Sequence, residues 1–394
     1  MDSGGGWRLG HRPALDGLRG VAILLVLTAH TWPLGIDGGV VGVTVFFGLS
    51  GFLITALLLD EHQRTGSVSF RAFYIRRARR LLPALYAYLA AWTLIGAIGW
   101  NVLELRLGDV LVAVTYSTNW VMAAGVGVSN VVAHTWSLAI EEQFYLLWPL
   151  TFLGLRRWPR LPAMTAILGI VAAVVLRLVR WDGVDPSGWV IYHRTDTRMD
   201  SLLLGCLLAI VVKRTGGVAA PWRHVGWPAV GLLALLLTWR NDVVSYLVTP
   251  FGASLAACGL IVAALARGAG WLEQPVLRWF GRRSYALYLW HYPLAALSWP
   301  HFHRLSTWAA VVLALVAAEA SWWLVEKPFG RRRGSERGRR VERGVPRLEV
   351  AEVGVHAERV ERDTRGDSAH AGRGDSAHQD PIDVHVQVVE RRHH

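Results

Sequence analysis

Apolar and polar positions along this chain form long blocks, in which apolar runs near the ~20 residues that cross a bilayer are separated by short basic linkers. The blocks predict an all-α, polytopic integral membrane protein with about ten transmembrane helices. The expected helices lie near 15–35, 39–59, 81–100, 134–155, 162–180, 200–213, 225–239, 245–266, 284–300 and 307–325.

The basic linkers predict the orientation of these helices. Arginine-rich linkers occur at 60–80, 156–160, 213–224 and 267–283. Ten spans place all of them on one side together with both termini, which is cytoplasmic by the positive-inside rule. If 107–124 also crossed, the linker at 156–160 would be exported, so we expect a re-entrant or external half-helix there. No cleavable signal peptide is expected, because the first apolar run lacks a small-residue cleavage site.

Composition supports a membrane protein and argues against a nucleic-acid-binding protein and against a protein held together by disulfides or metal ions. Apolar residues make up 53% of the chain, charged residues only 18%, and the mean hydropathy is +0.32. The formal charge of +12 comes from arginines between apolar runs, which indicates membrane anchoring and no nucleic-acid partner. Cys206 and Cys258 both fall in apolar runs, so we expect neither a disulfide framework nor a metal site.

The C-terminal segment has a different composition. Residues 331–394 contain no aromatic residue, alternate arginine with acidic residues, and repeat RGDSAH at 365–370 and 373–378. Such a segment cannot bury enough apolar surface to fold. We therefore expect a membrane domain over 12–330, followed by a disordered cytoplasmic tail over 331–394.

The first apolar run holds two ionisable residues, Arg19 and His30. Eleven helical steps of about 100° bring both side chains to one face, roughly 16 Å apart along the axis. Ionisable groups inside a bilayer cost several kcal/mol and mark functional sites by default. Arg19 and His30 are thus the leading candidates for a site.

The segment HTWSLAIEEQFYLLWP (134–149) carries a second polar group. His134 and Glu141 are seven residues apart and share a helical face, whereas Glu142 is rotated by about 100°. We favour a site role for Glu141. For Glu142, a site role and an ion pair with an arginine of a neighbouring helix are equally compatible with the pattern.

Two further segments are candidates for shaping a site. In YHRTDTRMDSLLLG (192–205), Arg198 and Asp200 suggest a polar loop that runs into a helix start, where capping or ion pairing explains Asp200 as well as substrate contact does. In GRRSYALYLWHYPL (281–294), Ser284 and His291 lie seven apart on one face with Tyr288 between them. A histidine beside aromatic residues is also typical of a structural interfacial position.

Seven ordered motifs together resemble one family, acyltransferase family three, over residues 12–330. The motifs are Arg19 with His30, FFGLSGFLI (46–54), RRARRLLP (76–83), HTWSLAIEEQFYLLWP, TDTRMDSLLLG (195–205), SYALYLWHYPL (284–294) and VEKPF (325–329). The resemblance implies a bacterial cell-membrane enzyme that moves an acyl group, commonly acetyl, from cytoplasmic acyl-CoA to a hydroxyl. The acceptor is a cell-surface glycan or a sugar-containing metabolite.

The resemblance also implies roles for individual residues. The family's first-span pair falls on Arg19 and His30, its arginine motif on Arg76, Arg77 and Arg80, and its Trp-to-acid motif on Trp136 and Glu141. Histidine suits deprotonation of a hydroxyl near neutral pH, so we assign His30 as general base, with an acyl-histidine as a variant. The three arginines suit the phosphates of coenzyme A, and Arg19 the pantetheine end or the thioester carbonyl.

Acyl-CoA is expected as a co-substrate, with no tightly bound cofactor and no metal. Some relatives carry an attached esterase-like periplasmic domain, so transfer is completed either in the membrane unit or by a separate periplasmic partner. The alternative function is a secondary transporter or permease for a small polar or glycolipid substrate, which also holds ionisable groups at the bilayer midplane. A transporter is expected to show inverted-repeat symmetry, and the sequence shows none.

Overall fold

The computed structural model describes residues 7–31, 38–155, 157–181, 189–238, 247–302 and 304–329. These residues form helices and connecting turns, with no strand among them, which confirms the all-α class. The chain separates into two units, residues 1–340 and 341–394, and the second unit lies outside the described residues. The expected tail over 331–394 lies outside them as well.

Fourteen α-helices and several short turns of other helix types follow one another in the described part of the chain. The longer helices are α1 (Pro13–Thr31), α2 (Gly38–Thr65), α3 (Phe70–Ala97), α6 (Trp136–Leu155), α7 (Leu161–Arg180), α9 (Thr195–Arg214), α11 (Thr249–Leu265) and α14 (Thr307–Ser321). The shorter elements are α4 (Leu107–Val114), α5 (Thr118–Ala123), η1 (Ala133–Thr135), α8 (Trp189–His193), η2 (Ala220–Val225), α10 (Gly226–Thr238), η4 (Gly270–Glu273), α12 (Pro275–Arg282), α13 (Ser284–Ala296) and η5 (Trp322–Glu326).

Five helices of the described part are long and apolar enough to cross a membrane. They are Pro13–Thr31, Gly38–Thr65, Phe70–Ala97, Leu161–Arg180 and Thr307–Phe329. The other expected spans coincide with helices that are shorter or less uniformly apolar, so the count of ten stays a prediction. The stretch 107–124 forms α4 and α5, of 8 and 6 residues, and neither is long enough to cross.

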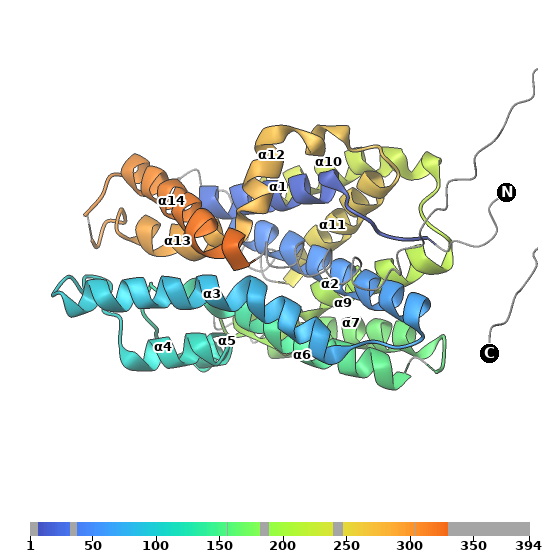
Figure 1. Cartoon of the computed structure of the whole chain (residues 1–394), viewed down its shortest axis with the longest axis horizontal. Coiled ribbons are helices and arrows are strands. Elements are labelled where there is room, and N and C mark those ends of the chain that lie inside the picture. Colours follow the sequence, from blue (N-terminus) through green and yellow to red (C-terminus); the bar gives the residue numbers. More distant parts are fainter. Residues whose placement is uncertain are drawn as a thin grey trace, which may run out of the picture. The chain divides into compact units, whose positions relative to one another are not determined.

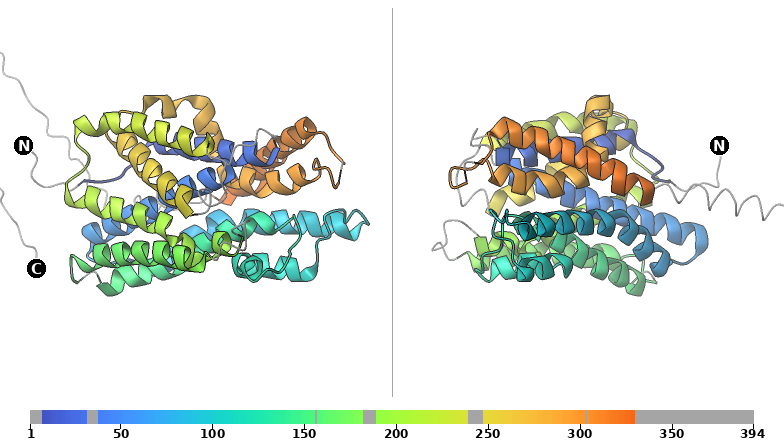
Figure 2. Two further views of the ribbon diagram at one scale, coloured as in Figure 1. Left: turned by 180° about the vertical axis from the view of Figure 1, so that it is seen from behind. Right: turned by 60° about the vertical axis from the view of Figure 1, so that its left-hand side comes forward.

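Helix α2 lies at the centre of this helical unit. Of its most apolar window, 78% is buried, against 22% for the window of Thr307–Phe329. Helices α1, α9 and α11 contact it, while Figure 1 and Figure 2 show α3, α6 and α7 to one side of it and α1, α12, α13 and α14 to the other. Residues carried by α2 therefore face several helices at once.

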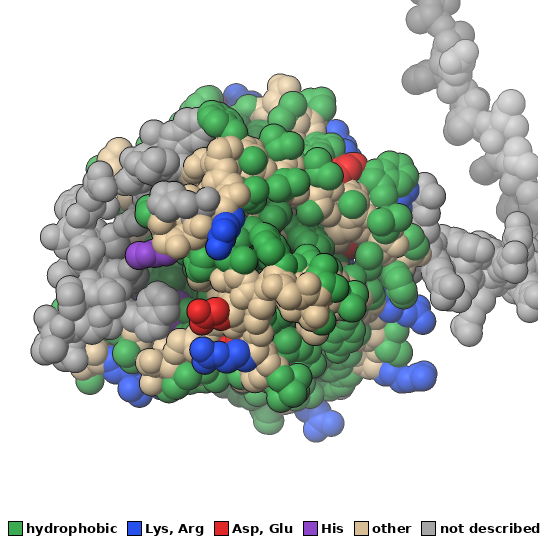
Figure 3. Space-filling model, turned by 90° about the vertical axis from the view of Figure 1, so that its left-hand side faces the viewer, with side chains coloured by type: hydrophobic (Ala, Val, Ile, Leu, Met, Phe, Trp, Pro, Cys, Tyr) green, Lys and Arg blue, Asp and Glu red, His purple; other side chains and the backbone are tan. Residues whose placement is uncertain are grey.

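Large apolar side chains remain exposed on the outer helices. Examples are Leu94 on α3, Leu168 on α7 and Leu324 at the end of the last span, exposed by 66%, 66% and 77%. Figure 3 looks along the helices onto one end of the molecule, where hydrophobic side chains cover much of the described surface and charged ones are scattered among them. Such an apolar surface fits lipid as the surrounding medium and supports a multi-pass membrane protein.

Close contact between α2 and α9 depends on glycine. A Cβ atom on Gly51 would lie 1.9 Å from the carbonyl oxygen of Leu202, and one on Gly205 would lie 2.1 Å from that of Gly48. Only glycine permits these backbones to approach so closely, as at many helix crossings in membranes. The glycines of FFGLSGFLI and of SLLLG thus fix how α9 sits against α2.

Two predicted boundaries are wrong. The segment 60–80 is not a linker, because α2 extends to Thr65 and α3 begins at Phe70, where the Ser69 hydroxyl accepts a hydrogen bond from the backbone of Ala72. The TDTR segment is not a loop, because α9 begins at Thr195. In both segments some polar side chains have partners on neighbouring helices, among them Asp60 with Lys213, Arg77 with Glu142 and Arg198 with Thr44.

Candidate active site

Two adjoining cavities lie among α1, α2, α6 and α13. The Arg19 cavity, of about 430 Å³ including space open to solvent, is lined by polar residues that include Arg19, Ser50, Ser137, Glu141, Ser284 and Tyr288. The His30 cavity, of about 550 Å³ on the same measure, is lined by residues that include His30, His134, Trp136, Tyr288, His291 and Tyr292. Val43 and Tyr288 line both cavities, which are therefore neighbours.

The two cavities receive polar residues from the same helices. Helix α1 carries Arg19 in one cavity and His30 in the other, and α13 likewise carries Ser284 and His291. Glu141 of α6 lies in the Arg19 cavity, while His134 of η1, just before α6, lies in the His30 cavity. The structure thus brings together residues more than 250 positions apart in the sequence, as the contact of Arg19 with Ser284 shows.

His30 has a defined tautomer. Its Nδ1 atom lies 2.8 Å from the backbone oxygen of Val26. Because a carbonyl oxygen only accepts, Nδ1 carries the ring proton in the neutral imidazole and Nε2 keeps a free electron pair. The half-buried ring contacts Tyr292 and His291, with centroid distances of 4.9 and 5.2 Å. His30 therefore presents a base within the cavity it lines.

Two more imidazoles complete this cavity. His291 is fully buried and its Nδ1 donates to the carbonyl of Tyr288 at 2.8 Å, while its Nε2 has no hydrogen-bond partner among the described residues. His134 stacks on Tyr292 at 5.2 Å; its ring interacts with the backbone of Leu289, but neither ring nitrogen makes a well-formed hydrogen bond in the described part of the chain. Buried polar atoms without partners are costly, so these atoms favour a polar guest in the cavity. No group of three His, Cys, Asp or Glu side chains in the described ranges is placed to hold a metal ion.

Hydroxyl groups hold the charged residues of the Arg19 cavity. Arg19 donates to the Ser284 hydroxyl through Nε at 3.3 Å and Nη2 at 3.0 Å. The Ser50 hydroxyl donates to the Glu141 carboxylate at 2.6 Å. A guanidinium and a carboxylate therefore line one cavity with donors and acceptors in fixed positions.

Tyr288 stands where the two cavities meet. Its hydroxyl donates to the backbone oxygen of His134 at 2.8 Å and forms a 2.5 Å hydrogen bond with the Ser137 hydroxyl. Because Tyr288 has one hydroxyl proton, Ser137 is the donor in the second bond. Trp136 packs nearby, with its ring 4.6 Å from the ring of Tyr192.

The three arginines of the RRARR segment differ in their surroundings. Arg76 pairs with Glu61 at 3.2 Å. Arg77 pairs with Glu142 at 3.0 Å and lies 3.0 Å from the centre of the Tyr145 ring. Arg80 is exposed and forms no direct ion pair with any described residue, although the charge of Glu326 acts on it from nearby. Glu142 thus forms the ion pair with a neighbouring helix, and Arg80 is the arginine of the three that is open to a ligand.

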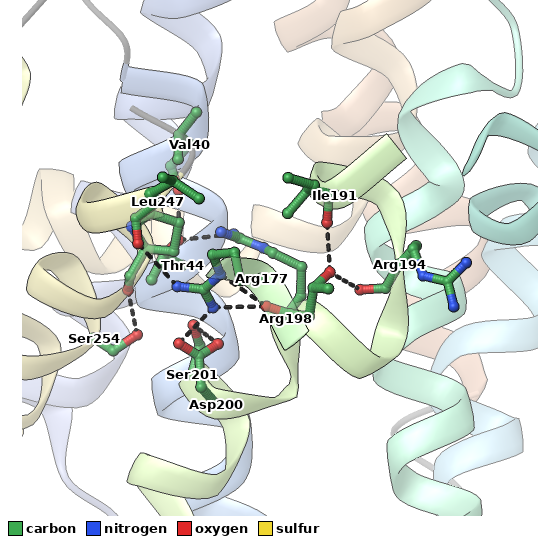
Figure 4. Close-up of polar contacts among 12 residues, drawn as sticks. Val40, Thr44, Arg177, Ile191, Arg194, Arg198, Asp200, Ser201, Leu247 and Ser254 are labelled. Carbon is green, nitrogen blue, oxygen red and sulfur yellow. Dashed lines mark hydrogen bonds and ion pairs between the residues drawn. The ribbon is translucent and has the colours of Figure 1, made fainter. Parts of the chain in front are cut away.

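Arg198 and Asp200 line neither cavity. Figure 4 shows the polar contacts that they make with Thr44 and Arg177. The Asp200 carboxylate lies 2.6 Å from Arg177 of α7, and both side chains are buried. Arg198 is also buried and donates to the Thr44 hydroxyl at 2.9 Å, with its guanidinium 5.0 Å from the Tyr192 ring. The sequence left Asp200 open between capping or ion pairing and substrate contact, and the structure shows an ion pair with Arg177.

The sequence analysis did not identify several residues of this region. Arg177 could have been identified, because it is an arginine inside an apolar run, as Arg19 is. Nothing in the sequence distinguishes Ser50 and Ser137, since serines in apolar helices usually bond to their own backbone. Tyr292 directly follows His291, and one residue of offset places a side chain about 100° away on an isolated helix.

Comparison with known proteins gives a consistent result. A family model described as an acyltransferase domain matches residues 12–327. The chain is 33% identical over 351 residues to a putative peptidoglycan O-acetyltransferase of Bacillus subtilis, covering 80% of this chain and 54% of that protein. It is 32% identical over 346 residues to a peptidoglycan O-acetyltransferase of Listeria monocytogenes, covering 80% and 55%. The chain spans about half the length of these relatives. No solved structure matches it.

Proposed function

The chain belongs to this acyltransferase family, and on that basis we propose that it is an integral-membrane O-acyltransferase. The proposed reaction moves an acyl group, acetyl by preference, from acyl-CoA to a hydroxyl of a cell-surface glycan. The names of the relatives support peptidoglycan as the acceptor class. A sugar-containing metabolite is the alternative acceptor.

The observation that carries the proposal is the free Nε2 of His30. The bond from Nδ1 to Val26 holds the tautomer that can take a proton at Nε2. In the proposed step Nε2 removes the proton of the acceptor hydroxyl while its oxygen attacks the thioester carbonyl. The carbon–sulfur bond then breaks, and the coenzyme A thiolate leaves and takes up the proton.

The Arg19 cavity suits the donor side of this reaction. Arg19, held by Ser284, is placed to bind the pantetheine end or to stabilise the charge that develops on the carbonyl oxygen. Glu141 lines the same cavity and is proposed as a further residue of the active site, with its carboxylate held by the Ser50 hydroxyl. His134, Trp136, Tyr288 and His291 shape the acceptor side, whereas Arg198 and Asp200 support the helices behind it.

The arginines of α3 are proposed to bind the phosphates of coenzyme A. Arg80 is the principal ligand, because Arg76 and Arg77 already have carboxylate partners. A guanidinium matches phosphate oxygens with two parallel hydrogen bonds. Acyl-CoA is then a co-substrate that reaches the protein from the cytoplasm, and we propose no tightly bound cofactor.

The proposed topology has ten spans, both termini in the cytoplasm of a bacterial cell and a disordered tail over 331–394 that follows the acyltransferase domain at 12–330. Its support is that ten crossings place every arginine-rich segment on one side. Completion of transfer by a separate periplasmic partner remains an alternative to transfer within the membrane unit.

A direct experiment separates the enzyme from the alternative transporter. Purified protein is incubated with acetyl-CoA labelled in the acetyl group and with purified glycan strands of peptidoglycan. An acyltransferase releases free coenzyme A and transfers the label to the glycan, while the His30→Gln variant does neither. A transporter leaves the thioester intact, and intact thioester in the presence of both substrates would contradict the proposal.

A further inference from the structure

Val43 and Tyr288 form the wall between the two cavities. Val43 comes from α2 and Tyr288 from α13, and each lines both the Arg19 cavity and the His30 cavity. Their side chains are almost fully buried, at 5% and 7% exposure. An acyl chain that extends from the Arg19 cavity towards the His30 cavity therefore runs beside these two side chains.

The tyrosine side of the wall is fixed in position. The Tyr288 hydroxyl is bound both by Ser137 and by the backbone oxygen of His134, at 2.5 and 2.8 Å. Swinging the ring aside would break two buried hydrogen bonds, and each buried polar group left without a partner costs about 1–3 kcal/mol. The opposite side is the branched side chain of Val43, whose χ1 angle is restricted.

Part of the His30 cavity is lined by small and apolar residues. Gly39 lies next to the base, since a Cβ atom there would be 3.7 Å from Cε1 of His30 and 3.4 Å from the Ala29 side chain. Val26 and Ala133 also line this cavity. The His30 cavity thus has an apolar part beside Val43, in addition to the part that His30, His134 and His291 line.

We propose that Val43 and Tyr288 select a short acyl group, acetyl over butanoyl and longer chains, by restricting passage to His30. The inference rests on the proposed function and specifies which donors the same site accepts. Coenzyme A stays on the Arg19 side with its sulfur, and the carbonyl carbon reaches the acceptor oxygen at the wall. Every added methylene must fit beside Val43, and one methylene too many in a well-packed apolar site costs roughly 10- to 200-fold in selectivity.

The test changes the wall in both directions. Val43→Ala removes two methyl carbons, and Val43→Ile adds one carbon. The full-length proteins are purified in detergent and given acetyl-, butanoyl- or hexanoyl-CoA with purified peptidoglycan glycan strands, and coenzyme A release is measured. We expect Val43→Ala to raise the butanoyl-to-acetyl ratio of kcat/KM by about tenfold or more, and Val43→Ile to lower it.

Val45→Ala is the matched control, because Val45 is fully buried on the same helix and lines neither cavity. Its ratio should equal that of the wild type. Unchanged ratios in both Val43 variants would overturn the inference while leaving the acyltransferase intact. Absence of coenzyme A release from every donor by the wild type would instead overturn the proposed function, and the selection with it. If Val43→Ala does not fold, Val43→Ile decides the question.

Discussion

The buried ion pair between Arg177 and Asp200 gives a prediction that separates support from substrate contact. The two charged groups are 2.6 Å apart, and their side chains are exposed by 1% and 0%. Arg177 also donates to the backbone oxygens of Thr197 and Leu247, at 2.6 and 3.2 Å. Arg177→Met leaves a buried carboxylate and two carbonyls without these donors. Breaking a buried pair in this way costs about 3–5 kcal/mol of folding free energy.

Thermal unfolding of the detergent-solubilised protein measures this loss. Replacing both partners, as in Arg177→Met with Asp200→Leu, should restore part of the stability, because the Asp200 carboxylate no longer stays buried without its guanidinium partner. Arg180→Met is the control, since Arg180 is 41% exposed and lies 3.9 Å from Asp196, where a pair contributes about 0–1 kcal/mol. If Asp200→Asn instead unfolds like the wild type but abolishes acyl transfer, Asp200 is a site residue and our interpretation is wrong.

Three further outcomes are expected. Arg80→Ala should raise the KM for acetyl-CoA roughly tenfold or more, and Arg76→Ala should raise it less. Arg80→Lys should restore the KM only in part, because a lysine lacks the two parallel donors of the guanidinium. Equal KM values for Arg80→Ala and Arg76→Ala would contradict the assignment. Gly205→Ala should lower thermal stability by about 1–3 kcal/mol, because its Cβ would lie 2.1 Å from the Gly48 oxygen, whereas Gly154→Ala, which has open space around it, should not. Reporter domains fused after Gly330 and after Arg160 should both report cytoplasm, and an external signal from either would refute the topology.

Spacing along one helix was enough to predict which residues share a face. Arg19 and His30, like Ser284 and His291, fall into adjoining cavities because the rise and rotation of an α-helix are nearly constant. The all-helical class followed from the apolar blocks in the same way. Both predictions depend on local geometry, which the sequence specifies directly.

Partners between helices could not be predicted in this way. Three arginines of one segment have different surroundings, because Glu61 and Glu142 form ion pairs with two of them, whereas the third has Glu326 nearby without a direct ion pair. Which acid reaches which arginine depends on how each helix is rotated and shifted against its neighbours. That arrangement is set by contacts such as the one at Gly51, which are distributed over many residues of several helices.

The central claim is that His30 is the general base, and the acyl-transfer rate of His30→Gln tests it most directly. Glutamine keeps a polar side chain of similar reach but cannot take the proton. We predict a loss of at least about 100-fold in transfer of the acetyl group to glycan, with thermal unfolding and acetyl-CoA affinity close to those of the wild type. Substantial turnover by a correctly folded His30→Gln protein would contradict the claim and move the search for the base to Glu141 or His134.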